Sequence, residues 1–128
     1  MGLDMYLHGR KYCNHSNELK ADGFKVSSIN LELGYWRKHP NLHGYIVESF
    51  ADGEDNCQPI HLEEDDIRQI IDAIKSGTLP DTEGFFFGES TGSDQEKAHD
   101  LAIFEAALSW LEAPDTGYLR DISYQASW

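Results

Sequence analysis

The chain has 128 residues, of which 40% are hydrophobic and 12% aromatic, so it is long enough to bury its own core and too apolar for a disordered segment. Its formal net charge of −13 repels nucleic acid and anionic membranes, so we expect no direct nucleic-acid binding and no membrane association. No apolar run approaches the ~18 residues of a membrane span, and the first residues lack a signal-peptide pattern. The two cysteines are too few for a disulfide framework. Together these features predict a cytoplasmic protein.

Alternating side chains predict two strands in the first third of the chain. Residues 3–8 alternate, with Leu3, Met5 and Leu7 on one face. Residues 9–24 are polar and predict a long loop. Alternation resumes at Val26, and a second strand, antiparallel to the first, is expected to direct these side chains to one face: Ile29, Leu31, Leu33 and Tyr35.

Two helices with a short strand between them are expected next. Pro40 is tolerated in the first turn of a helix and predicts a helix start, with Asp52-Gly53 as its end. A strand is expected at residues 59–62. Isoleucines with helical spacing from Ile67 to Ile74 then predict a second helix, closed by Gly77.

The last third is expected to hold a strand, a long helix and a final strand. The apolar segment GFFFG at 84–88 favours a buried strand, and Ser93 or Asp94 can cap a helix that Pro114 ends. We expect this helix to be the central one because its apolar stripe is wide: Leu101, Ile103, Phe104, Ala107, Leu108, Trp110 and Leu111. The tail alternates through Tyr118, Ile122, Tyr124, Ala126 and Trp128.

These elements predict one α+β domain spanning residues 1–128. Its sheet is expected to be mixed or antiparallel, with about five strands, and its three helices to pack mainly on one face.

The most unusual stretch of the chain is acidic. Residues 1–40 hold six Lys or Arg and four Asp or Glu, whereas residues 41–128 hold four and nineteen. The stretch 52–66 alone carries these carboxylates: Asp52, Glu54, Asp55, Glu63, Glu64, Asp65 and Asp66. A helix start accounts for the last four through the helix dipole. Together with Asp81, Glu83 and Glu89, the cluster could imitate phosphate charge and bind a basic groove on a partner protein.

The same stretch gives no convincing metal site, and we expect no metal and no cofactor. A calcium loop starting at Asp52 would need glycine where Cys57 stands. A zinc set can be drawn only with poor ligand spacing, from Cys13, His15, Cys57 and His61.

An enzyme or a small-molecule binder is the alternative hypothesis. Its catalytic candidates are His43 and Cys57, since a thiolate needs a nearby imidazole. His43 also shares a helical face with Ile46 and Val47, which is more typical of a core histidine. An aromatic and basic patch supplies the candidate ligand-binding residues: Asp4, Trp36, Arg37 and Lys38.

Five segments carry a resemblance that covers most of the chain: MGLDMYL at 1–7, GYWRKHPNLH at 34–43, DGEDNC at 52–57, GFFFG at 84–88 and YQASW at 124–128. They resemble a group of small phage and bacterial proteins that begin MGLDMYL. The resemblance implies a phage context, hence the host cytoplasm, and implies no mechanism.

The sequence therefore favours a non-enzymatic, acidic accessory protein. We expect it to bind and inhibit a basic host or defence protein that handles nucleic acid, through the seven carboxylates of 52–66. Self-association between the basic first segment and the acidic remainder is a third hypothesis.

Overall fold

The structure is a computed structural model, and it describes residues 2–13, 19–84, 87–113 and 119–128. In chain order its elements are β1 (Asp4–Tyr12), β2 (Lys20–Ala21), β3 (Phe24–Lys25), β4 (Ser28–Arg37), α1 (Pro40–Phe50), β5 (Ile60–Leu62), α2 (Glu64–Ser76), α3 (Asp94–Glu112) and β6 (Leu119–Ser127). The predicted α+β fold class is confirmed.

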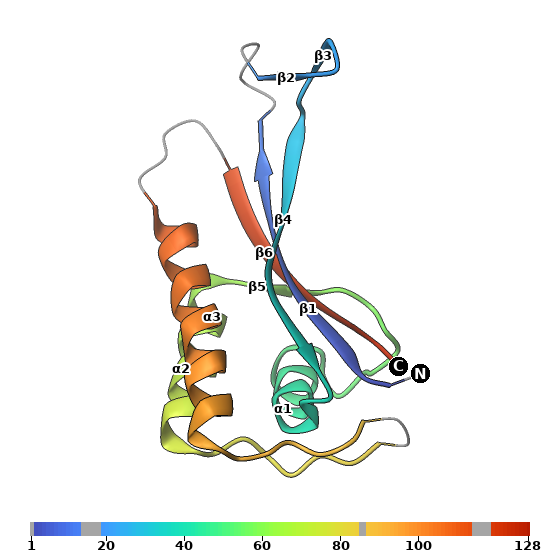
Figure 1. The fold of residues 1–128 in the computed structure, drawn as a ribbon, viewed down its shortest axis with the longest axis vertical. Helices are drawn as coiled ribbons and strands as arrows, with labels where there is room; N and C mark the ends of the chain where they lie inside the picture. Colours follow the sequence, from blue (N-terminus) through green and yellow to red (C-terminus); the bar gives the residue numbers. More distant parts are fainter. Residues whose placement is uncertain (1, 14–18, 85–86, 114–118) are drawn as a thin grey trace.

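A four-stranded sheet has the order β4-β1-β6-β5, and every neighbouring pair is antiparallel. Met5 pairs with Ala126 and Leu7 with Tyr124, and all four side chains are buried beneath the helices. The far ends of β1 and β4, with the β2–β3 hairpin, extend beyond the helices as an arm (Figure 1). The predicted loop at 9–24 is therefore wrong in part, because β1 continues to Tyr12 and the hairpin follows; residues 14–18 lie outside the described part.

The predicted face of β4 is wrong at Tyr35. Leu7 pairs with Gly34 but His8 pairs with Glu32, so Leu33 is an extra residue in β4. A bulge of this kind reverses which face the following side chains take. Leu33 packs against the core and Trp36 is buried, whereas the Tyr35 ring lies 5.2 Å from the ring of Tyr6 on the outer face.

The three helices begin where the sequence predicts, and α1 and α2 end close to the predicted residues. Pro40 is at the start of α1, and Gly77 follows α2 with a left-handed φ of 69°. The Glu63 backbone N–H donates to the Asp66 carboxylate (2.9 Å) at the start of α2, and the Glu96 backbone N–H donates to Ser93 Oγ (3.1 Å) at the start of α3. Pro114, the predicted end of α3, lies outside the described residues.

Two further expectations are corrected. In the described part of GFFFG, the Phe87 backbone N–H donates to the Gly84 carbonyl (3.1 Å), and Phe87 is a turn residue rather than a strand residue. The core also centres on α1 instead of α3. In α3 only Asp100, Phe104 and Ala107 are buried, because α3 lies beside α2 at the edge of the core (Figure 1). Six residues of α1 are buried.

Candidate functional site

A buried hydrogen-bonded chain joins β4, the start of α1, α3 and the segment before α3. Trp36 Nε1 donates to Asp100 Oδ1 (2.7 Å), Asp100 Oδ2 lies 2.7 Å from His39 Nε2, and His39 Nδ1 lies 2.7 Å from Ser90 Oγ. His39 is 3% exposed and Asp100 is 1% exposed. A carboxylate at this depth is costly unless it is paired, and here both of its oxygens have donors.

The carboxylate fixes how the imidazole is protonated. Since a carboxylate can only accept, His39 Nε2 carries the proton that faces Asp100. In neutral His39, Nδ1 is then an acceptor, and the Ser90 hydroxyl donates to it.

A second carboxylate lies near the imidazole. Glu96 Oε1 is 3.6 Å from His39 Nε2. Burial alone would raise the pKa of Glu96, but the backbone N–H of Thr91 and the nearby His39 outweigh it and keep that pKa below its ordinary value.

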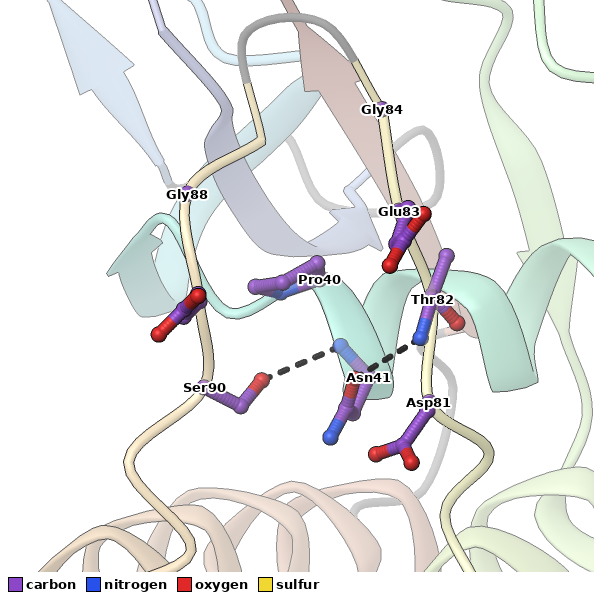
Figure 2. Close-up of a pocket in the computed structure, with 9 residues that line it drawn as sticks. Pro40, Asn41, Asp81, Thr82, Glu83, Gly84, Gly88 and Ser90 are labelled. Carbon is purple, nitrogen blue, oxygen red and sulfur yellow. Dashed lines mark hydrogen bonds between the residues drawn. The ribbon is translucent and has the colours of Figure 1, made fainter.

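Ser90 also contacts the first turn of α1. The Asn41 backbone N–H donates to Ser90 Oγ (3.1 Å), which satisfies one of the unpaired N–H groups at the helix start. The side chain of His39, the residue before the helix, makes no such capping bond. Asn41 Oδ1 accepts from the Thr82 backbone N–H (3.0 Å), and Figure 2 shows the other end of the Asn41 amide directed into the space between Ser90 and Asp81.

Ser90 lies at the edge of a cavity of about 550 Å³, which we call the acidic cavity (Figure 2). It is lined by Pro40, Asn41, Asp81, Thr82, Glu83, Gly84, Gly88, Glu89 and Ser90. Three of these described lining residues are carboxylates and none is Lys or Arg. A group that enters the cavity therefore meets negative charge beside the start of a helix.

The predicted catalytic candidates His43 and Cys57 lie in different places. His43 is 2% exposed; its Nδ1 lies 2.6 Å from the Tyr124 hydroxyl and its Nε2 3.0 Å from both Asp55 oxygens. Cys57 lies instead in a cavity with Tyr6 and other residues of the outer sheet face. Among described residues, the structure records no contact between Cys57 and His43.

The surroundings of His43 are those of a core residue. The rings of Phe87 and Trp128 lie 5.2 Å and 5.9 Å from its ring. Burial, followed by the charge of Asp55, raises the pKa of Tyr124 well above its ordinary value, so Tyr124 stays a neutral donor to His43. Four segments distant in sequence, at 34–43, 52–57, 84–88 and 124–128, therefore meet at this one side chain.

The structure brings three residues of the predicted ligand-binding patch, Trp36, Arg37 and Lys38, to one cavity, and the fourth, Asp4, binds Arg37. On the outer face, Arg37 Nη1 donates to both Asp4 oxygens (2.9 and 3.1 Å) and the Tyr35 hydroxyl donates to Asp4 (2.6 Å). The Tyr35 hydrogen bond is the main cause that keeps the pKa of Asp4 below its ordinary value. Trp36 faces the opposite way and holds Asp100. Lys38 lines a cavity of about 370 Å³ that also reaches Trp36, Arg37 and His39.

Most of the predicted partner-binding carboxylates have intramolecular uses. Asp55 binds His43, Asp66 accepts from the Glu63 backbone, and Arg68 donates to Glu64 (2.7 Å) and Asp65 (3.2 Å). Asp52 and Glu54 remain exposed in the turn after α1.

Within the described residues, no group of three or more His, Cys, Asp or Glu side chains could hold a metal ion; His15 of the candidate zinc set lies outside them. Across the same ranges, no helix is long and apolar enough to cross a membrane.

Sequence reasoning did not select His39, Ser90 or Asp100. These residues come from three separate segments, and no spacing rule connects them. The one local signal is His39 directly before Pro40, which places an imidazole at a helix start.

No protein-family profile matches the chain, no curated protein matches it, and no solved structure matches it. The resemblance to the MGLDMYL group therefore stays a prediction.

Proposed function

We propose that the protein binds a basic protein surface by accepting a lysine or arginine side chain in the acidic cavity, and so inhibits a host or defence protein that handles nucleic acid. The observation that supports this proposal is the lining of the cavity: Asp81, Glu83 and Glu89 surround it and no cation lines it among the described residues. Proteins that bind nucleic acid expose Lys and Arg to contact phosphates, and the cavity offers carboxylates to the same side chains.

The intramolecular partners of the carboxylates in 52–66 favour a binding site farther along the chain. Asp55 and the carboxylates of α2 already have partners within the protein, so they are less able to bind a second one. Asp81, Glu83 and Glu89 belong to the same acidic set in the sequence, and they are the ones that surround a cavity. The net charge of −13 adds long-range attraction for a basic partner.

A defined basic probe tests the proposal. Binding of a fluorescein-labelled nona-arginine peptide is measured by anisotropy at 0.05 M and 0.3 M NaCl, for the wild type and for two double variants of equal charge change, Asp81→Asn/Glu83→Gln and Asp52→Asn/Glu54→Gln. Each lost ion pair costs up to about 1 kcal/mol, so we expect the cavity variant to bind roughly tenfold more weakly. The Asp52/Glu54 variant should stay within about twofold, and salt should weaken binding.

Equal weakening by both double variants would show that net charge alone attracts the peptide, and it would overturn the cavity as the site. Weakening by the Asp52/Glu54 variant alone would return the site to the stretch after α1. A wild type that binds the peptide no better than a nona-glutamate control would overturn the function itself.

A further inference from the structure

The arrangement of Ser90, His39 and Asp100 corresponds to a nucleophile, a general base and a carboxylate that orients the base. The two linking distances, Ser90 Oγ to His39 Nδ1 and His39 Nε2 to Asp100 Oδ2, are both 2.7 Å. We propose that Ser90 is a reactive nucleophile that takes the acyl group of an uncharged or cationic ester bound in the acidic cavity. This inference does not depend on partner binding, and it assigns an activity to residues that the partner-binding proposal does not use.

The base is held in the protonation state that the reaction needs. Asp100 accepts from Trp36 Nε1 as well as from His39, so the carboxylate cannot rotate away without breaking a second buried bond. With Nε2–H directed at Asp100, the Nδ1 lone pair of neutral His39 is directed at the Ser90 hydroxyl. Serine hydrolases of unrelated folds depend on the same relation between base and nucleophile. In the serine-protease template Nε2 faces the serine and Nδ1 the carboxylate, whereas here Nδ1 faces the serine and Nε2 the carboxylate.

A substrate in the acidic cavity can reach Ser90, whereas the base, His39, is buried. His39 and Asp100 are buried, whereas Ser90 is half-buried and lines the acidic cavity. A helix cap needs only an acceptor oxygen for the Asn41 N–H. The Ser90 hydroxyl fills that role and also donates to an imidazole, which a cap does not require. The N–H bond and the positive end of α1 also stabilise negative charge that develops on Oγ.

A candidate donor for the second developing charge is the side chain of Asn41, the residue whose backbone N–H donates to Ser90 Oγ. Because Asn41 Oδ1 is occupied by the Thr82 N–H, the Asn41 Nδ2 group is the free end of that amide. Figure 2 shows it between Ser90 and Asp81, on the cavity side. We assign it to the carbonyl oxygen of the ester, where donors stabilise a tetrahedral intermediate.

The reaction balances with water as the only co-reactant. Ser90 Oγ bonds to the carbonyl carbon while its proton passes to His39 Nδ1, and the bond from that carbon to the leaving alkoxide then breaks, with the Nδ1 proton going to the alcohol. Water attacks the acyl-serine, gives a proton to Nδ1 and releases the carboxylic acid, and the proton returns to Ser90 Oγ.

The cavity limits which esters can react. Asp81, Glu83 and Glu89 repel a substrate with a negative group and attract one with a positive group. We therefore expect the reactivity order cationic, then neutral, then anionic among esters that share one leaving group.

A covalent probe of serine nucleophiles tests the assignment without using a charged ligand. The full-length protein is treated with diisopropyl fluorophosphate and examined by intact mass and by peptide mapping. We expect one diisopropylphosphoryl group per chain, located on Ser90 and absent in Ser90→Ala. His39→Gln should slow labelling by about 10² or more, the contribution typical of a general base.

Two measurements keep the test decisive if a variant folds poorly. The neighbouring exposed Ser93 serves as an internal control on the same peptide map, and the comparison of ester hydrolysis by the wild type needs no variant. Hydrolysis of p-nitrophenyl acetate is then compared with that of p-nitrophenyl esters bearing a trimethylammonium or a carboxylate group. An unlabelled Ser90, labelling shared equally with Ser93, or a labelling rate unchanged in folded His39→Gln would each overturn the proposal. Loss of peptide binding without loss of labelling would affect the partner-binding proposal alone.

Discussion

At the scale of single residues, the Trp36–Asp100–His39–Ser90 chain places polar groups where burial without partners is costly. Each buried polar atom in it has a partner, and the Asp100 carboxylate, which is 1% exposed, has one contact from Trp36 Nε1 and one from His39 Nε2. The chain also links β4, α1 and α3 at one point. Its contribution to stability is therefore open to measurement through its central member, Asp100.

Replacing Asp100 with Ala should destabilise the fold by about 3 kcal/mol, because Trp36 Nε1 and His39 Nε2 both lose their acceptor in a buried position. Urea unfolding at pH 7 measures the change. The matched control is Glu105→Ala on the same helix, where an exposed carboxylate lies 3.7 Å from Lys75 Nζ and a loss below about 1 kcal/mol is expected. Equal losses in the two variants would contradict a buried network that depends on Asp100.

Local sequence patterns predicted most helices and strands, but they did not predict the buried hydrogen-bonded network. The alternation of Met5 and Leu7 and the position of Pro40 are signals of one strand or one helix start, and the structure confirms them. His39, Ser90 and Asp100 meet only through the packing of elements distant in sequence, so no residue spacing could reveal the contact. The acidic stretch is conspicuous in the sequence, yet most of its carboxylates bind within the protein, as Asp66 does at a helix start and Glu64 does with Arg68.

At the scale of elements, single residues decide where whole segments lie. The extra Leu33 in β4 reverses the alternation, which is why Trp36 reaches Asp100 while Tyr35 joins the outer face. An alternation pattern read from sequence assumes an unbroken register, so it could not place Tyr35. Gly44 has a similar effect in α1, because its lack of a side chain lets the Thr82 segment approach the helix.

Replacing Gly44 with Ala should destabilise the protein although alanine is the better helix former. A Cβ at Gly44 would lie 1.9 Å from Thr82 Oγ1 and 2.8 Å from Thr82 Cβ, so the segment that carries the edge of the acidic cavity must move. Overpacking of this kind costs about 1–3 kcal/mol, against a gain of about 1 kcal/mol in helix propensity. Urea unfolding gives the net change.

In a control background, the change in stability caused by Gly44→Ala should have the opposite sign. In a Thr82→Gly background the clashing side chain is gone, while the backbone N–H that donates to Asn41 remains. Gly44→Ala should then stabilise the protein by up to about 1 kcal/mol. A destabilisation of the same size in both backgrounds would show that Gly44 is needed for a reason other than its approach to Thr82.

At the scale of the whole molecule, charge is distributed by region. The arm formed by the ends of β1 and β4 and the β2–β3 hairpin carries basic side chains, including Arg10, Lys20 and Lys25, and its tip exposes Phe24 (77%). The helical body carries most of the carboxylates, and residues 41–128 hold nineteen acids against four bases. The carboxylates of the helical body therefore repel one another. Exposed ion pairs such as Arg68 with Glu64 offset this repulsion only slightly.

Added salt should stabilise the protein, since it screens this repulsion more than it weakens the few exposed ion pairs. The Debye length falls from about 30 Å at 0.01 M to about 3 Å at 1 M, so repulsion across the body is removed over that range. We expect the Tm, followed by circular dichroism, to rise by several degrees between 0.01 M and 0.5 M NaCl. The Asp52→Asn/Glu54→Gln variant, with two fewer charges, should start with a higher Tm and respond less to salt. A Tm that falls as NaCl is added would mean that ion pairs such as Asp4–Arg37 outweigh the net charge of −13.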